Sequence, residues 1–214
     1  MKTNPALFSA NELLNAYSNK TMSPVEAIKA ILDHIKNYDK KLNSFRLVDE
    51  EKALESARAS EKRWSMGTPA GLVDGVPTTI KDLVATKGWS TRRGSLTTND
   101  KGPWKEDAPL VARLRSNGAV LLGKTTTPEF GWKGVTDSPL TGITRNPWDL
   151  TKTPGGSSGG AAAAAAACFG ALHHGSDGGG SIRMPSGYTG IYLSLIHISE
   201  PTRRYAISYA VFCL

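Results

Sequence analysis

Residues 155–181, GGSSGGAAAAAAACFGALHHGSDGGGS, contain two glycine-rich runs, and each run carries serine. Between the runs, the alanines at 161–167 predict a helix that ends at Gly170, because alanine is the best helix former. Ala171 to His174 then predicts a short strand that leads into the second run. Small alanine side chains let the helix approach a sheet closely. Glycine lets a backbone turn sharply and bring its N–H groups near a ligand, so both runs are candidate parts of a site.

The same alternation of strand and helix occurs upstream. Val76 to Ile80 predicts a strand with Lys81 at its end. A helix is predicted to start in Asp107-Ala108-Pro109 and to stop at Asn117-Gly118, and Ala119 to Gly123 predicts a buried strand. Strand, helix and strand at this spacing predict an α/β domain with a largely covered sheet.

The first third of the chain predicts helices that pack and carry no chemistry. Ser23-Pro24-Val25-Glu26 has the pattern of a helix start, with a capping serine, a proline and a glutamate three residues after the cap. Apolar residues then recur at helical spacing from Ile28 to Ile35, and Asp49 opens a second predicted helix.

Composition indicates an ordinary globular protein. The chain has 214 residues, 39% hydrophobic and 21% charged, and a formal net charge of +7. The basic residues are scattered without interleaved aromatic residues, which gives no indication of nucleic-acid binding. The two cysteines, Cys168 and Cys213, form no C-x-x-C motif, and no signal peptide or run of about 18 apolar residues occurs. These features predict a cytoplasmic location, with no metal or other cofactor.

A serine nucleophile needs a base, and histidine is the usual one. Gly155 to Gly159 matches G-x-S-x-G with Ser157 as the central serine, which leaves a histidine-dependent esterase as an alternative. However, His34 is expected on a helix surface, and His173 and His174 are expected to pack on opposite faces of one strand. A lysine kept neutral by burial, together with a second serine, is the other way to move the proton.

Several motifs in the same order and at similar intervals resemble the amidase signature hydrolases, from the N-terminal helices to about Tyr192. The matching segments are Gly75-Val76-Pro77 with Ile80-Lys81-Asp82, Gly123-Lys124-Thr125 with Glu129-Phe130, Thr144 to Asp149, Gly155 to Gly160 and Gly175 to Pro185. The resemblance implies a mixed sheet core covered by helices on both faces. It also implies hydrolysis of an amide C–N bond through an acyl-enzyme.

The resemblance assigns roles to individual residues. Ser181 resembles the nucleophile, Ser157 the bridging serine that follows a cis peptide bond, and Lys81 the base. The backbone N–H groups that resemble the oxyanion hole belong to Gly178, Gly179, Gly180 and Ser181. The expected substrate is a small-molecule amide that releases ammonia. Two alternatives remain: the glutaminase-type subunit of a tRNA-dependent amidotransferase, and a non-catalytic fragment.

The C-terminal stretch differs in character from the rest. We interpret residues 1–192 as the N-terminal part of an amidase signature domain. Residues 193–214 resemble a translated sequencing adapter and are expected to be non-native, with a real strand pair as the alternative. The predicted sheet is therefore incomplete at its C-terminal side. Neither the particular amide nor the oligomeric state is indicated by the sequence.

Overall fold

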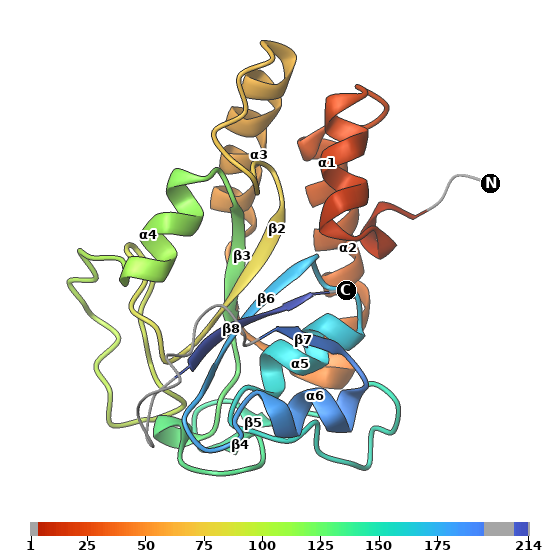
Figure 1. The fold of residues 1–214 in the computed structure, drawn as a ribbon. Coiled ribbons are helices and arrows are strands. Elements are labelled where there is room, and N and C mark those ends of the chain that lie inside the picture. The colour runs from red at the N-terminus through yellow and green to blue at the C-terminus, as the bar shows by residue number, and fades with distance from the viewer. Residues whose placement is uncertain (1–3, 195–207, 214) are drawn as a thin grey trace.

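A mixed six-stranded sheet forms the centre of the molecule (Figure 1). The computed structural model describes residues 4–194 and the backbone of residues 208–213. The strands, in their order across the sheet, are β1 (Phe45–Val48), β3 (Val120–Thr125), β2 (Pro77–Lys81), β6 (Leu172–Asp177), β8 (Ser208–Cys213) and β7 (Tyr192–Ser194). β2 runs parallel to both β3 and β6, whereas β1, β8 and β7 add antiparallel pairs. A separate two-stranded sheet pairs β4 (Asp137–Ser138) with β5 (Gly142–Ile143).

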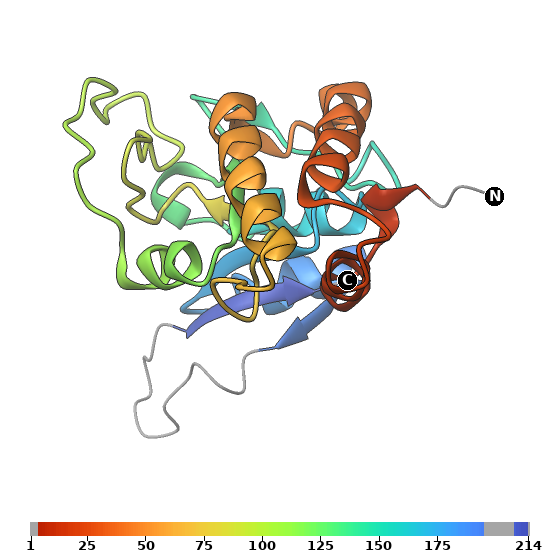
Figure 2. The same cartoon turned by 90° about the horizontal axis from the view of Figure 1, so that it is seen from above.

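Helices cover both faces of the sheet, as predicted. The helices are α1 (Ala10–Ser18), α2 (Pro24–Leu42), α3 (Glu50–Ser65), α4 (Pro109–Ser116), α5 (Gly159–Ala166) and α6 (Arg183–Thr189), with short 3-10 turns η1 (Pro5–Leu7) and η2 (Glu129–Gly131). Val120 and Leu122 of β3 pack with α2 and α3, which lie side by side in Figure 2. Leu121 packs on the opposite face with Val111 of α4. This alternation along β3 explains why its first three residues, Val120 to Leu122, are all apolar.

The start of α2 follows its predicted cap. Ser23 accepts the Glu26 N–H, and Glu26 accepts the Ser23 N–H, so both halves of the capping box are present. The start of α4 differs slightly from the prediction. Ala108 is its N-cap residue and makes no side-chain cap, because alanine has no polar side-chain atom. The Asp107 carboxylate accepts the Lys87 N–H and pairs with Arg115.

Glycine at the start of α5 allows this helix to contact the sheet directly. A Cβ at Gly160 would overlap the backbone and side chain of Thr126, which follows β3. The Gly159 N–H donates to the Thr136 hydroxyl at 3.1 Å, and the same hydroxyl donates to the Gly155 carbonyl at 2.8 Å. The helix therefore begins at Gly159, two residues before the predicted start, and its N-terminal turn lies near the ends of β2 and β6.

Some strands and helices are longer than predicted or were not predicted at all. β6 continues to Asp177 rather than ending at His174, and neither β1 nor α6 was expected from the sequence. Most of the segment predicted to be non-native, 193–214, lies outside the described residues, which omit 195–207 and 214. Of that segment, 208–213 pairs through its backbone with β6 and β7. Among the described residues, no helix combines the length and apolar character needed to cross a membrane.

Candidate active site

Lys81 ends β2 and is completely buried among hydroxyl groups. Its Nζ lies 2.8 Å from Ser157 Oγ and 2.8 Å from Ser158 Oγ. It also lies 3.1 Å from Ser176 Oγ and 3.4 Å from the Ser176 carbonyl oxygen. A serine hydroxyl can either donate or accept a hydrogen bond, so these partners suit an amine as well as an ammonium group.

Burial makes Lys81 easy to deprotonate. Removal from water lowers the pKa of Lys81 from 10.5 to about 7, although the nearby Asp177 carboxylate acts in the opposite direction. At neutral pH, a substantial fraction of this side chain is therefore an uncharged amine that can accept a proton.

Ser157 lies in the sharp turn that leads into α5. The Gly156–Ser157 peptide bond is cis. Ser157 itself is buried, and a Cβ at Gly156 would lie within 2.7 Å of the Val135 backbone. Close packing of loop 131–136 against this turn therefore requires glycine before the serine. The arrangement aims the Ser157 hydroxyl at Lys81.

Ser181 lies in the second glycine run, directly before α6, and is half-buried. Its carbonyl accepts the Ser158 N–H at 3.0 Å, which links the two glycine runs through their backbones. Within the described part of the chain, the side-chain hydrogen bonds that centre on Lys81 do not include the Ser181 hydroxyl. The hydroxyls of Ser181 and Ser157 instead share one cleft.

Asp177 shapes the second glycine run by binding several of its N–H groups. Its carboxylate accepts the N–H groups of Gly180 at 2.6 Å and of Ile182 at 3.1 Å, and it forms an ion pair with Arg183 at 2.9 Å. Burial alone would raise the pKa of Asp177, but the Arg183 guanidinium and these N–H groups hold it well below its ordinary value. The Gly180 N–H is already used, so the oxyanion donors that remain from the prediction are Gly178, Gly179 and Ser181.

A cleft of about 530 Å³ opens beside these residues. Its polar side contains Ser157, Ser176, Gly178, Gly179 and Ser181. Its other lining residues are Leu83, Gly131, Trp132, Lys133, Gly134 and Met184. The cleft brings three of the four predicted positions of the second run together with Ser157. Lys81 contacts Ser157 but is itself buried.

Histidine is not the partner of Ser157, because Lys81 occupies that position. His173 is fully buried, and its two ring nitrogens lie 2.9 Å from Thr79 Oγ1 and 3.0 Å from the Gly170 carbonyl oxygen. Burial lowers the pKa of His174 to about 3. The predicted packing role is therefore correct for the strand histidines. His34 is half-buried against Phe169 rather than on the surface, because its Nε2 hydrogen-bonds the Ala167 carbonyl.

The sequence analysis missed two partners of Lys81. Ser158 and Ser176 both bind Lys81 but were not singled out, although both lie in the two glycine runs. Loop 145–149 holds α6, because Asn146 Nδ2 donates to the Tyr188 carbonyl and Trp148 Nε1 donates to the Thr189 carbonyl. Among the described residues, no three His, Cys, Asp or Glu side chains are grouped closely enough to hold a metal ion.

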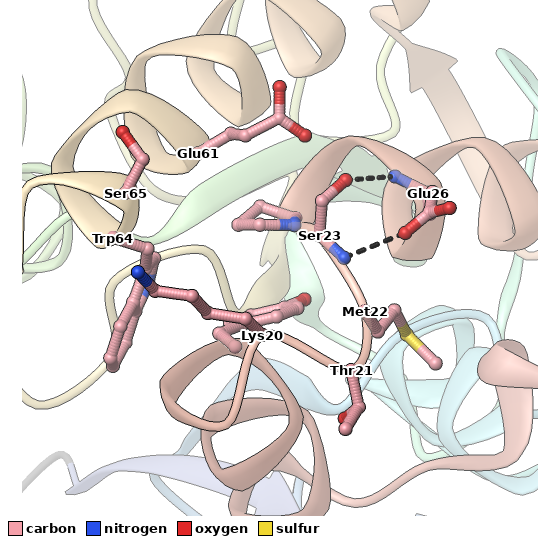
Figure 3. Close-up of a pocket in the computed structure, with 10 residues that line it drawn as sticks. Lys20, Thr21, Met22, Ser23, Glu26, Glu61, Trp64 and Ser65 are labelled. Carbon is pink, nitrogen blue, oxygen red and sulfur yellow. Dashed lines mark hydrogen bonds between the residues drawn. The ribbon is translucent and has the colours of Figure 1, made fainter.

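A second pocket, of about 400 Å³, lies between the α1–α2 turn and the C-terminal end of α3 (Figure 3). Ser23 in its lining is engaged in helix capping, since Ser23 and Glu26 hydrogen-bond each other at 2.8 and 3.2 Å. Lys20, which also lines the pocket, is exposed, whereas Lys81 is completely buried. This pocket therefore lacks the contact between a serine hydroxyl and a buried lysine that is present at Lys81.

Comparison with known proteins identifies the family. The sequence model named Amidase matches residues 26–192, which include both glycine runs and Lys81. The chain belongs to the Amidase family. Solved structures agree with this membership: a bacterial aryl acylamidase of the amidase signature enzymes is 31% identical with a TM-score of 0.87, and the alignment covers 96% of this chain and 45% of that one.

Relatives in this Amidase family differ in the activities for which they are named. A glutamyl-tRNA(Gln) amidotransferase subunit of Salinispora tropica is 44% identical over 86% of this chain and 37% of its own length. Indoleacetamide hydrolase of Bradyrhizobium diazoefficiens is 40% identical over 86% of this chain and 35% of its own length. The chain thus spans little more than a third of these relatives.

Proposed function

We propose that this chain carries the catalytic centre of an amide hydrolase that works through Ser181, Ser157 and Lys81. The observation that carries the proposal is the 2.8 Å contact between the buried Lys81 amine and the Ser157 hydroxyl. A general base must be within hydrogen-bond reach of the proton that it accepts, and its pKa must lie near the working pH. The pKa of Lys81, about 7, meets the second condition.

The proposed reaction proceeds in two halves. The Ser181 oxygen attacks the amide carbonyl carbon while its proton passes to Ser157, and the Ser157 proton passes to Lys81. The negative oxygen of the tetrahedral intermediate accepts N–H groups from Gly178, Gly179 and Ser181. The C–N bond then breaks, and the leaving amine takes the proton back from Lys81 through Ser157. Water attacks the resulting ester of Ser181 by the same route and releases the acid.

Residues 1–192 are, in this proposal, the N-terminal part of an amidase signature domain. The match of the family model up to residue 192 supports that boundary. A free-standing amidase with ammonia as the leaving group is the first form of the proposal. The glutaminase-type subunit of a tRNA-dependent amidotransferase is the second, and it is favoured by the 44% identity to the Salinispora protein. Glutamine hydrolysis in the absence of other proteins separates the two forms.

Covalent labelling by a fluorophosphonate tests the centre itself. We expect one phosphonyl group on Ser181 of the chain, and we expect Ser181→Ala to abolish the label. The matched control is Ser116→Ala, which removes an exposed serine on α4 and leaves labelling unchanged. A chain that takes up no label at Ser181 would favour the non-catalytic alternative, and equal labelling of Ser181→Ala would place the nucleophile elsewhere.

A further inference from the structure

A second buried lysine lies on the strand next to Lys81. Lys124 of β3 is completely buried, and its Cα is the register partner of Ile80. Its Nζ donates to the Val84 carbonyl and to the hydroxyls of Thr86 at 3.1 Å and Thr91 at 3.3 Å. These three partners match the three donors of an ammonium group.

Lys124 shares Asp82 with an arginine from a third strand. Asp82 is 1% exposed, and its carboxylate lies 3.8 Å from Lys124 Nζ and 2.9 Å from Arg46 Nε. Arg46 comes from β1, which is the neighbour of β3 on the side away from β2. The cluster of Arg46, Asp82 and Lys124 therefore connects three adjacent strands at the end where Lys81 lies.

The backbone of Asp82 is held as firmly as its side chain. Its N–H donates to the Thr125 carbonyl at 3.1 Å, and its carbonyl accepts the Arg93 N–H at 3.0 Å. Asp82 directly follows Lys81, and consecutive side chains of an extended chain point to opposite sides. The two side chains accordingly have separate partners: serines for Lys81, and the two cations for Asp82.

We propose that the Arg46–Asp82–Lys124 cluster positions Lys81, by fixing the end of β2 so that the Lys81 amine stays between the hydroxyls of Ser157 and Ser158. Burial lowers the pKa of Lys124 to about 8, but Lys124 does not line the cleft, so it is a positioning residue and not a second base. This inference rests on the proposed function, because the position of the Lys81 amine affects catalysis only if Lys81 is the base. The residues that line the cleft in the described part of the chain include no member of the cluster, so the cluster acts through Lys81 and not on the substrate.

The test separates positioning from stability with a pair of compensating substitutions. Asp82→Asn alone leaves two cations, Lys124 and Arg46, without their shared carboxylate, which is strongly destabilising. The double variant Asp82→Asn/Lys124→Met also removes the more deeply buried of these cations, and we expect it to regain part of the lost stability in urea unfolding. We nevertheless expect its rate of fluorophosphonate labelling at Ser181 to stay at least tenfold below that of the wild-type chain.

A spectroscopic readout follows Lys81 without any need for activity. The ¹³Cε resonance of Lys81, titrated against pH by NMR, should show a midpoint near 7 in the wild-type chain. In the double variant we expect the midpoint to rise, because a less firmly held amine gains access to water. The matched control is Asp74→Asn/Arg63→Met, which removes another ion pair, 2.6 Å apart, between the buried Asp74 and the half-buried Arg63 near the opposite end of β2. It should change neither the labelling rate nor the Lys81 midpoint.

Each outcome has one meaning. A double variant that folds, labels at the wild-type rate and keeps the wild-type midpoint would overturn the inference. If that variant does not fold, Arg46→Lys replaces it in the test. An unchanged labelling rate at Ser181 and an unchanged Lys81 midpoint in Arg46→Lys would also overturn the inference. Absence of label on the wild-type chain would instead count against the proposed function, while the Lys81 midpoints would still decide whether the cluster positions this side chain.

Discussion

Replacement of Lys81 by methionine should make the chain more stable at neutral pH while it abolishes labelling of Ser181. The pKa of the buried amine falls from 10.5 to about 7 on folding, which corresponds to a cost of about 5 kcal/mol when the side chain is fully protonated. Methionine has a similar length and no charge, so it avoids that cost. It also loses the contacts with the serine hydroxyls, each of which contributes about 1 kcal/mol. The expected net gain at pH 7 is about 1–2 kcal/mol.

The pH dependence of this gain is the sharper part of the prediction. Below the folded pKa of about 7 the lysine is protonated in both states, so its full cost is present. Between pH 7 and pH 10.5 the unfolded chain binds more protons than the folded one, and the wild-type chain becomes more stable as pH rises. The advantage of Lys81→Met should therefore fall by about 2 kcal/mol between pH 7 and pH 9 and should change sign at higher pH.

Urea unfolding followed by tryptophan fluorescence measures this difference at pH 6, 7, 8, 9 and 10. The matched control is Lys62→Met on the exposed side of α3, whose stability relative to wild type should not change over the same range. A stability difference between Lys81→Met and wild type that stays constant from pH 7 to pH 10 would show that Lys81 is charged in the folded chain. The argument that it acts as a base would then fail.

Three further outcomes are expected. The rate of fluorophosphonate labelling should rise with pH to a plateau with a midpoint near the Lys81 pKa of about 7, as stopped samples analysed by mass spectrometry would show. Asp177→Asn should lower the free energy of unfolding at pH 7 by at least about 2 kcal/mol, because hydrogen bonds to a charged group contribute about 1.5–3 kcal/mol each. Since the pKa of Asp177 is depressed in the folded chain, this difference in stability between the variant and the wild-type chain should disappear as the pH falls well below 4. Gly160→Ala should cost about 1–3 kcal/mol in urea unfolding through overlap with Thr126, whereas Gly187→Ala, where a Cβ meets no atom, should not incur that clash.

The parts of the fold that follow local rules were predictable from the sequence. Pro77 to Lys81 is a strand in a covered sheet because its apolar and β-branched residues suit burial, and the Ser23 cap fixes the start of α2. The family resemblance assigned Lys81 and Ser157, and the structure places these two side chains in contact. Their catalytic roles and that of Ser181 stay predictions.

The elements that depend on distant contacts were not predictable. Helix α6 has seven residues and contains Pro185 and Gly187, so its sequence predicts no helix. It forms because Asp177 binds the N–H groups at its start, while Asn146 and Trp148 bind carbonyls at its end. The Arg46–Asp82–Lys124 cluster was equally hidden, since it requires the strand order β1-β3-β2, and that order is set by tertiary packing.

The two carboxylates closest to Lys81 explain how its amine can stay neutral. An unpaired carboxylate beside a buried lysine would hold it in the ammonium form, because an opposite charge favours the charged state. Asp82 follows Lys81 in sequence, but its charge is directed toward Arg46 and Lys124. Asp177 raises the pKa of Lys81, but its charge is shared with Arg183 and several N–H groups. Each acid is thus compensated by an arginine, and burial among hydroxyls remains the dominant influence on the amine at the end of β2.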